Sequence, residues 1–254
     1  MFFVFDIESV PDTDLLRQVV SDAPEDEEKL LEKASEELTR NNSGFLPPMY
    51  HRMVSWVGLW IQNTGEPRQQ VAWTGENEKE GLEQLIESLQ AYKDFGLIHH
   101  NGRGFDLPLL TYRAMKYGIQ LPLRLNRHEI RYRYSKENID LIDEFSNYGA
   151  SSWPKLKHIG ALIGMPVKLT GEGGEVHTMF KNGELDRIER YCYEDVVATY
   201  LIWLHLKYTI GEMTTEHFEN LKGRALQKLY EIQKMDEDGE KKVDNDGETE
   251  GDEE

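Results

Sequence analysis

The sequence of 254 residues predicts an α/β fold, with a mixed five-stranded sheet flanked by helices. Short runs rich in apolar, β-branched and aromatic residues predict five strands, at residues 1–4, 51–61, 68–73, 96–100 and 139–142. Longer stretches of helical composition or spacing predict the main helices, at residues 78–92, 105–117, 184–208 and 214–235. Three strands that come first, followed by strands that alternate with helices, are typical of an α/β sandwich.

Two carboxylates follow the first predicted strand, in the stretch Phe5-Asp6-Ile7-Glu8-Ser9. Residues i and i+2 of a strand point to the same face, so Asp6 and Glu8 lean over one spot. Two buried like charges raise each other's pKa unless a cation neutralises them, and oxygen ligands suit Mg²⁺ or Mn²⁺. Taken alone, the pair is also explained by an ordinary strand that runs into an acidic turn.

The net charge of −18 is spread unevenly along the chain. Residues 236–254 contain eleven acidic and two basic residues, and they carry half of that charge. We expect this tail to be disordered, because it lacks apolar residues and repels itself. It would be a solubilising segment, a self-inhibitor that lies across a basic cluster, or a docking tail. The mildly acidic remainder argues against a general nucleic-acid coat protein, but not against an enzyme with a local basic patch.

Three observations favour a protein of the cytoplasm. No apolar run approaches the length of a membrane span, so we expect no membrane association. The first strand begins at once, so we expect no signal peptide. Cys192 is the single cysteine, and no intrachain disulfide is therefore expected.

Three further candidate residues lie far along the chain. Asp106 follows the fourth predicted strand, in HNGRGFDLPLL, five residues after Asn101. It stands at the same edge of the sheet as Asp6, although a helix N-cap also explains an aspartate there. Tyr191 and Asp195 lie at i and i+4 on one face of a long predicted helix. Each signal is weak alone, because such pairs are common on ordinary helices.

The three motifs together are far more specific. In chain order they are Asp-x-Glu on a first strand, Asn-x-x-x-Phe-Asp after a later strand, and Tyr-x-x-x-Asp on a late helix. With them, the chain resembles the DEDDy 3′–5′ exonuclease superfamily, and most of all a stand-alone group of predicted exonucleases related to the proofreading domain of family-B DNA polymerases. The resemblance covers residues 1–210 and implies a ribonuclease H-like fold. Residues 22–48 would be a helical insertion in this domain, and residues 211–235 a helix that packs on it or extends it.

The resemblance implies a metal-dependent 3′–5′ exonuclease, which hydrolyses phosphodiester bonds to nucleoside 5′-monophosphates. The implied cofactors are two divalent cations, Mg²⁺ or Mn²⁺. The implied ligands are Asp6, Glu8, Asp106 and Asp195, with Asp6 shared by both ions. The implied role of Tyr191 is to orient the attacking water, since a phenol with a pKa near 10 is a poor general base.

Substrate contacts are predicted at Asn101, Phe105, Arg124, Arg127, Arg131 and Arg133. Phe105 either stacks on the terminal base or packs under the helix, and the arginines either follow the phosphate backbone or decorate a solvated hairpin. We expect Asp140 to have a structural or positioning role beside the site.

The polymerase-like second motif favours the 3′ end of single-stranded DNA as the substrate. An exoribonuclease that trims RNA 3′ ends is the alternative enzyme. A non-catalytic module that holds nucleic-acid ends is the alternative outside enzymes. Four mutually repelling acids argue against that module, because a pure binder gains nothing from them.

Overall fold

A mixed five-stranded sheet forms the centre of the computed structural model, which describes residues 1–39, 45–166 and 175–246. Its strands lie in the order β3-β2-β1-β4-β5, so the chain begins in the central strand. β2 is antiparallel to β1 and β3, whereas β4 is parallel to both β1 and β5. The bounds of the strands are β1 Phe2–Pro11, β2 His51–Ile61, β3 Pro67–Thr74, β4 Gly96–His99 and β5 Asn138–Asp140.

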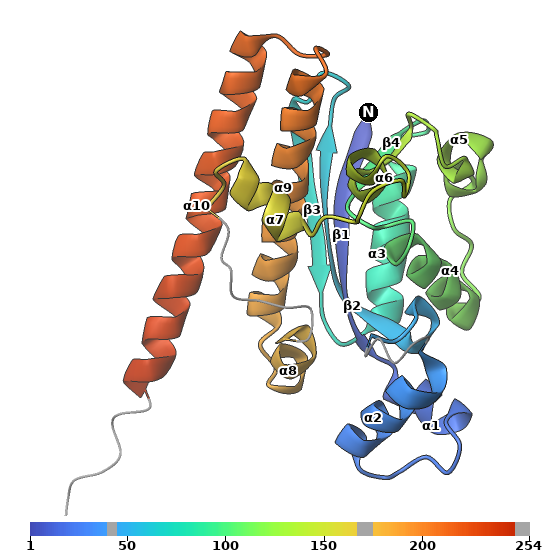
Figure 1. The fold of residues 1–254 in the computed structure, drawn as a ribbon. Coiled ribbons are helices and arrows are strands. Elements are labelled where there is room, and N and C mark those ends of the chain that lie inside the picture. Colours follow the sequence, from blue (N-terminus) through green and yellow to red (C-terminus); the bar gives the residue numbers. More distant parts are fainter. Residues whose placement is uncertain (40–44, 167–174, 247–254) are drawn as a thin grey trace, which may run out of the picture.

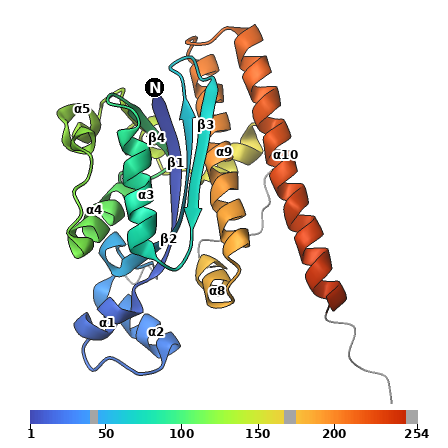
Figure 2. The ribbon, with the colours of Figure 1, turned by 180° about the vertical axis from the view of Figure 1, so that it is seen from behind.

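Helices cover both faces of the sheet (Figures 1 and 2). One face carries α3 and α4, and the other carries α9, α10 and the short α7. The bounds of the helices are α1 Thr13–Val19, α2 Glu27–Leu38, α3 Glu78–Gln90, α4 Asp106–Tyr117, α5 His128–Arg131, α6 Leu141–Ser146, α7 Leu156–Leu162, α8 Glu175–Lys181, α9 Leu185–Thr209 and α10 Thr215–Asp246, with short 3₁₀ turns η2 Pro48–Tyr50 and η3 Leu123–Asn126. Among the described residues, no helix combines the length and apolar character of a membrane span.

The side chains of β1 alternate between two cores. Phe3, Phe5 and Ile7 pack with α3 and α4 on one face, while Val4 packs with α9 on the other. The Phe3 ring lies so close to β2 that a Cβ on Gly58 would come within 2.0 Å of it, which explains a glycine in mid-strand. Because Asp6 and Glu8 are even-numbered like Val4, this alternation turns both carboxylates toward α9.

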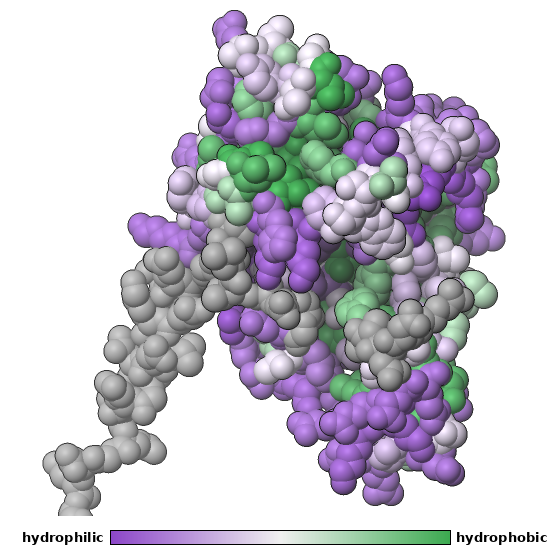
Figure 3. Space-filling model, viewed as in Figure 1, coloured by the Kyte–Doolittle hydropathy of each residue, from purple (hydrophilic) through white to green (hydrophobic). Residues whose placement is uncertain are grey.

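A separate small core holds the segment around α1 and α2. Leu16 of α1 and Leu30 of α2 are completely buried in this core. The outer surface of the two helices is mostly hydrophilic (Figure 3). Asp26 caps α2, because its carboxylate accepts the backbone N–H of Lys29 at 3.0 Å. α2 lies within the segment 22–48, where the sequence predicts a helical insertion. Residues 40–44 of that segment lie outside the described residues.

A buried ionic network joins the layers on the α4 side. The Arg113 guanidinium, from α4, donates to Asp12 at 2.7 Å and also to Glu78 at the start of α3. Glu78 in turn accepts the backbone N–H of Met53 on β2 at 2.7 Å and the Tyr117 hydroxyl at 2.8 Å. Asp12, Glu78 and Arg113 are each at most 3% exposed. The network therefore ties the end of β1, β2, α3 and α4 to one another.

The structure differs from the sequence prediction at the end of the first strand. The predicted turn at residues 10–12 is absent, because β1 pairs with β2 as far as Pro11, with an irregularity between Glu8 and Ser9. Pairing with β4, in contrast, stops at Val4. Asp6 and Glu8 thus lie inside a strand, but beyond the end of its parallel neighbour.

The predicted fifth strand and the predicted acidic tail also need correction. Strand β5 ends at Asp140, and residues 141–142 already belong to α6, because Asp140 caps that helix at the backbone N–H of Ile142. Helix α10 continues to Asp246, eleven residues into the segment predicted to be disordered. Extending an existing helix needs no new nucleation, and glutamate and lysine are good helix formers. The last part of the predicted tail, residues 247–254, lies outside the described residues.

Candidate active site

Asp6 and Glu8 form the centre of the candidate site. Glu8 is only 9% exposed. Burial is the largest cause that raises the pKa of Asp6, to about 6. Burial also raises the pKa of Glu8 well above its usual value, and the charges of Asp6 and Asp195 raise it further. The two carboxyls lie close enough for each to influence the pKa of the other.

Asp106 reaches the same site from the first residue of α4. It is not the N-cap, since Phe105 holds that position. The side chain is 5% exposed, and its Oδ1 has no hydrogen-bond partner. Burial and the charge of Asp6 raise its pKa well above the usual value, although the backbone of Ile7 opposes the shift. An unpartnered buried carboxylate oxygen is costly in a folded protein, which indicates a place for a positively charged ligand.

The loop that delivers Asp106 is held by Asp140. The Asp140 carboxylate accepts the backbone N–H of Asn101 at 2.8 Å and that of Arg103 at 3.1 Å. Asn101 has a φ of +67°, a left-handed conformation that asparagine tolerates better than most residues. Nothing in these contacts makes Asp140 a ligand. Its hydrogen bonds instead agree with the positioning role that we expected for it.

Helix α9 brings the last residues to the site. Burial raises the pKa of Asp195 well above its usual value, and the charge of Asp6 is the next cause. Burial and then the charge of Asp195 raise the pKa of the Tyr191 phenol. This phenol therefore stays protonated at neutral pH. The i, i+4 spacing predicted that these two residues share a face, and both respond to the charges of β1.

Cys192 also faces the site, which the sequence analysis did not predict. It is fully buried, and its thiol donates to the backbone carbonyl of Asp6 at 3.4 Å and to the Asp6 carboxylate at 3.8 Å. Single ligand atoms of Asp6, Glu8 and Cys192 lie within 4.8 Å of one another. The signal was present, because Cys192 and Asp195 lie at i and i+3 on one helical face.

The donor set fits hard divalent cations. Four carboxyls from β1, α4 and α9 come together, Glu8 and Asp106 buried and Asp6 and Asp195 half-buried, and the pKa of each is raised. Within the part of the chain that the structure describes, no arginine or lysine forms an ion pair with any of the four. Carboxylate oxygens are the ligands that Mg²⁺ and Mn²⁺ prefer, while the thiol is softer. Asp6, Glu8, Asp106 and Asp195 are therefore the residues that could hold such ions.

The predicted substrate contacts have other partners in the structure. Phe105 packs at the entrance of α4, where its ring lies edge-on to His51 with centroids 5.2 Å apart and 5.3 Å from the ring of Phe45. Arg124 is largely buried, and it binds the carboxylate of Glu137 and the carbonyl of Phe95. Contacts within the protein therefore already engage the Phe105 ring and the Arg124 guanidinium.

The other predicted arginines are more accessible. Arg127 pairs with Asp94 at 3.3 Å, with both side chains exposed. Arg133 binds Asp143 through two nitrogens, at 2.6 and 3.2 Å. Arg131 donates to the neutral amide of Asn126 at 2.8 Å, and it therefore keeps its charge uncompensated there. Asn101 lies in the loop already described.

Comparisons with known proteins bear on the fold and the family. Residues 43–242 match the sequence profile of a family described as a predicted 3′–5′ exonuclease related to the exonuclease domain of PolB. A DNA polymerase of Archaeoglobus fulgidus is 21% identical over 154 residues, which cover 57% of this chain and 20% of that protein. The structure of the family B DNA polymerase from the hyperthermophilic archaeon Pyrobaculum calidifontis matches with a TM-score of 0.51 and 15% identity, over 80% of this chain and 25% of that chain.

These matches confirm the predicted fold class, α/β and ribonuclease H-like. The chain spans about a fifth of the length of the first polymerase and a quarter of the second. The profile match contains Asp106, Tyr191 and Asp195, and it begins after Asp6 and Glu8. The structure, and not the profile match, therefore links Asp6 and Glu8 on β1 with the other two motifs.

Proposed function

We propose that this chain, which belongs to the family of predicted 3′–5′ exonucleases related to the exonuclease domain of PolB, removes nucleotides from the 3′ end of single-stranded DNA. The products would be nucleoside 5′-monophosphates. One observation carries the proposal: four buried or half-buried carboxyls converge from β1, α4 and α9, and Asp106 Oδ1 among them has no partner. Such an arrangement is costly without cations and useful for phosphodiester hydrolysis.

The proposed roles of the residues combine what the resemblance to DEDDy exonucleases implies with the contacts described above. Asp6, Glu8, Asp106 and Asp195 would hold two divalent ions, with Asp6 shared between them. When bound, such ions supply a water of lowered pKa and neutralise the charge that develops on the phosphate. Asp140 fixes the loop before Asp106 through its two backbone hydrogen bonds. Cys192 holds Asp6 from the α9 side through its thiol.

Tyr191 would orient the attacking water as a hydrogen-bonding group and not as a base. Its raised pKa keeps the proton on the phenol at neutral pH, so the hydroxyl remains a donor. It stands one helical turn before Asp195, on the face that contacts the site.

Replacing Tyr191 is expected to slow hydrolysis without removing it. Tyr191→Phe deletes one hydrogen bond near a charged group, worth about 1.5–3 kcal/mol, so we expect kcat to fall about ten- to a hundredfold. KM for an oligonucleotide should stay close to that of the unchanged protein. Tyr193→Phe is the matched control, because Tyr193 packs toward Lys228 of α10 and should keep full activity. Equal effects of the two substitutions would contradict the role of Tyr191.

The function itself is tested with 5′-end-labelled single-stranded DNA and RNA of one sequence, each with Mg²⁺, Mn²⁺ or EDTA. We expect a metal-dependent ladder that shortens the DNA from its 3′ end. Preferential shortening of RNA would establish the exoribonuclease alternative. Binding of either strand with no cleavage in any metal would contradict the enzyme and favour an end-binding module.

A further inference from the structure

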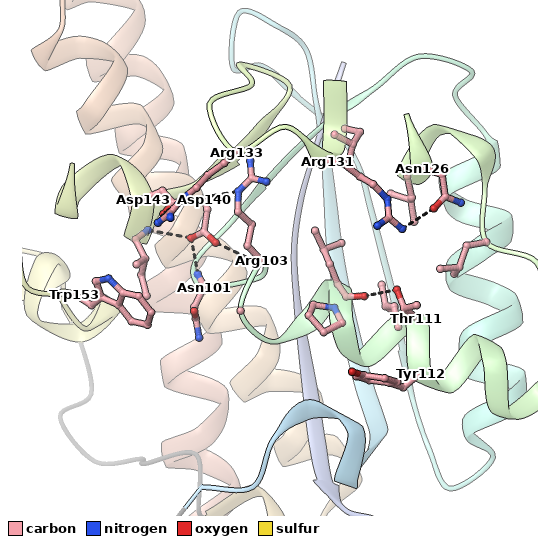
Figure 4. Close-up of a pocket in the computed structure, with 18 residues that line it drawn as sticks. Asn101, Arg103, Thr111, Tyr112, Asn126, Arg131, Arg133, Asp140, Asp143 and Trp153 are labelled. Carbon is pink, nitrogen blue, oxygen red and sulfur yellow. Dashed lines mark hydrogen bonds and ion pairs between the residues drawn. The ribbon is translucent and has the colours of Figure 1, made fainter. Parts of the chain in front are cut away.

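A groove opens beside the loop that delivers Asp106 (Figure 4). Its volume is about 660 Å³, within the range of about 300–1,000 Å³ that is usual for ligand sites. Its floor is apolar and includes Leu110, Leu125 and Ile130, which also belong to the core under α4. Asn101, at the start of the Asp106 loop, forms part of its wall. The groove therefore adjoins the candidate active site.

Two aromatic side chains stand at separate ends of this groove. Figure 4 shows Trp153 beside Asp143 and Asp140, and Tyr112 on the far side of the Asn101 loop. Trp153 is 63% exposed and Tyr112 is 40% exposed. Within the described residues no contact between aromatic rings involves Trp153 or Tyr112, so neither ring is taken up by stacking on another aromatic side chain. Unpaired bases stack on such rings whatever their identity.

One arginine that lines the groove, Arg131, forms no ion pair with a carboxylate among the residues that the structure describes. Arg103 and Arg133 also line it, but both form ion pairs with Asp143, at 3.3 and 2.6 Å. Arg131 instead contacts the neutral side chain of Asn126, and no ion pair to it is present in the described parts of the chain. An exposed guanidinium without a carboxylate partner is suited to a phosphate.

We propose that this groove seats unpaired nucleotides on the 5′ side of the scissile bond. Trp153 and Tyr112 stack on bases, and Arg131 contacts a phosphate of the same strand. The proposal rests on the proposed function, which places the 3′ end at the carboxylates. The groove has room for a nucleotide or two, and it begins at the loop that positions Asp106. Its occupant is single-stranded nucleic acid, because a duplex would present its bases stacked on one another and not to these rings.

The test measures binding by the full chain, apart from hydrolysis. The probe is a 5′-fluorescent oligothymidylate of about twelve residues with phosphorothioate linkages at its 3′ end, in Mg²⁺, followed by anisotropy. Trp153→Ala and Tyr112→Ala should each weaken binding about five- to fiftyfold. Arg131→Gln should reduce the slope of log K against log[salt] by about 0.7. Tyr230→Ala and Arg224→Gln, exposed residues of α10, are the matched controls.

A scan with single abasic residues makes the test specific. In the unchanged protein, an abasic residue at one or two positions near the 3′ end should weaken binding by a similar factor. If Trp153 or Tyr112 stacks on the base that is missing at that position, its replacement by alanine should abolish the loss of affinity caused by the abasic residue. If the substitution only disturbs the structure, the abasic residue should weaken binding by the same factor as before. Variants that bind every oligonucleotide like the controls would overturn the groove proposal.

Cleavage of a dinucleotide separates the two proposals. A dinucleotide places one nucleotide on the 5′ side of the scissile bond and cannot reach both rings, so the groove variants should slow its cleavage far less than cleavage of the longer strand. If nucleic acid is cleaved and the groove variants bind normally, the exonuclease proposal stands and the groove proposal fails. If neither the dinucleotide nor an unmodified oligothymidylate is cleaved in any metal but the aromatic variants lose binding, single-strand binding in the groove stands and the exonuclease proposal fails.

Discussion

Asp6→Asn is expected to lower hydrolysis of an end-labelled oligonucleotide by about a thousandfold or more. Asp6 is the carboxylate whose charge influences Glu8, Asp106 and Asp195 alike, so it lies at the centre of the four. Its loss would weaken the hold on both ions, and each ion contributes several kcal/mol to transition-state stabilisation. Single-turnover rates over a range of Mg²⁺ concentrations would measure the loss.

The same substitution is expected to stabilise the metal-free protein at neutral pH. The pKa of Asp6 is about 6 in the folded state, against an ordinary value of 3.8 for an aspartate in the unfolded chain. Between these values the folded state binds more protons than the unfolded state, so the free energy of unfolding falls as pH rises through this window. Above pH 6 the cost is fully present, and Asp6→Asn removes it. We expect a gain of up to about 3 kcal/mol in EDTA.

Urea denaturation with and without Mg²⁺ would show both effects. Mg²⁺ should raise the stability of the unchanged protein by mass action and that of Asp6→Asn much less. Glu219→Gln is a useful control, since Glu219 is exposed on α10, pairs with Lys222 at 2.8 Å and should leave the rate and metal response intact. Wild-type turnover in Asp6→Asn would contradict the assignment of the site.

Arg113→Met is expected to lower the free energy of unfolding by about 3–5 kcal/mol. Arg113 is 2% exposed, and its removal leaves Asp12 and Glu78 as buried carboxylates without their main cation. The loss is large because a buried unpaired charge costs far more than an exposed one. The midpoint and slope of urea denaturation at neutral pH would measure it.

Lys116→Met provides the matched control for Arg113. Lys116 contacts the same Asp12 at 3.0 Å, but its side chain is 45% exposed, so the loss should stay below about 1 kcal/mol. Adding Asp12→Asn and Glu78→Gln to Arg113→Met should recover part of the stability, because the unpaired charges disappear. A small loss for Arg113→Met alone would show that the network contributes little.

Much of the fold could be predicted because its signals are local. The apolar run at residues 51–61 is strand β2, and Gly118, with a φ of +63°, ends α4 as expected. The end of β1 could not be predicted in this way. Pro11 suggested a turn, but its strand partner in β2 is contributed by a segment forty residues away along the chain. Strand length there is decided by tertiary pairing.

Local sequence patterns likewise predicted some features of the candidate site, whereas others depend on tertiary contacts. The i, i+2 and i, i+4 spacings indicated which face Asp6, Glu8, Tyr191 and Asp195 share, since those spacings follow from backbone geometry. The role of Cys192 depends on which strand α9 packs against, and no local pattern contains that information. Likewise the sequence placed Arg124 in a basic cluster open to a substrate, but in the structure its guanidinium binds the Glu137 carboxylate and the Phe95 carbonyl. Partner choice for long side chains is a tertiary property.

The contact between Cys192 and Asp6 joins residues 186 positions apart, and this separation controls when the site forms. Asp6 and Glu8 leave the ribosome before Asp106, and α9 follows only after Asp106. A nascent chain that has folded only its sheet and α4 lacks both Tyr191 and Asp195. Under the proposed function, it is inert toward nucleic acid until α9 has been made and has packed on the sheet. A chain truncated before α9 would lack the residues with which α9 covers one face of the sheet, and it would not hydrolyse nucleic acid.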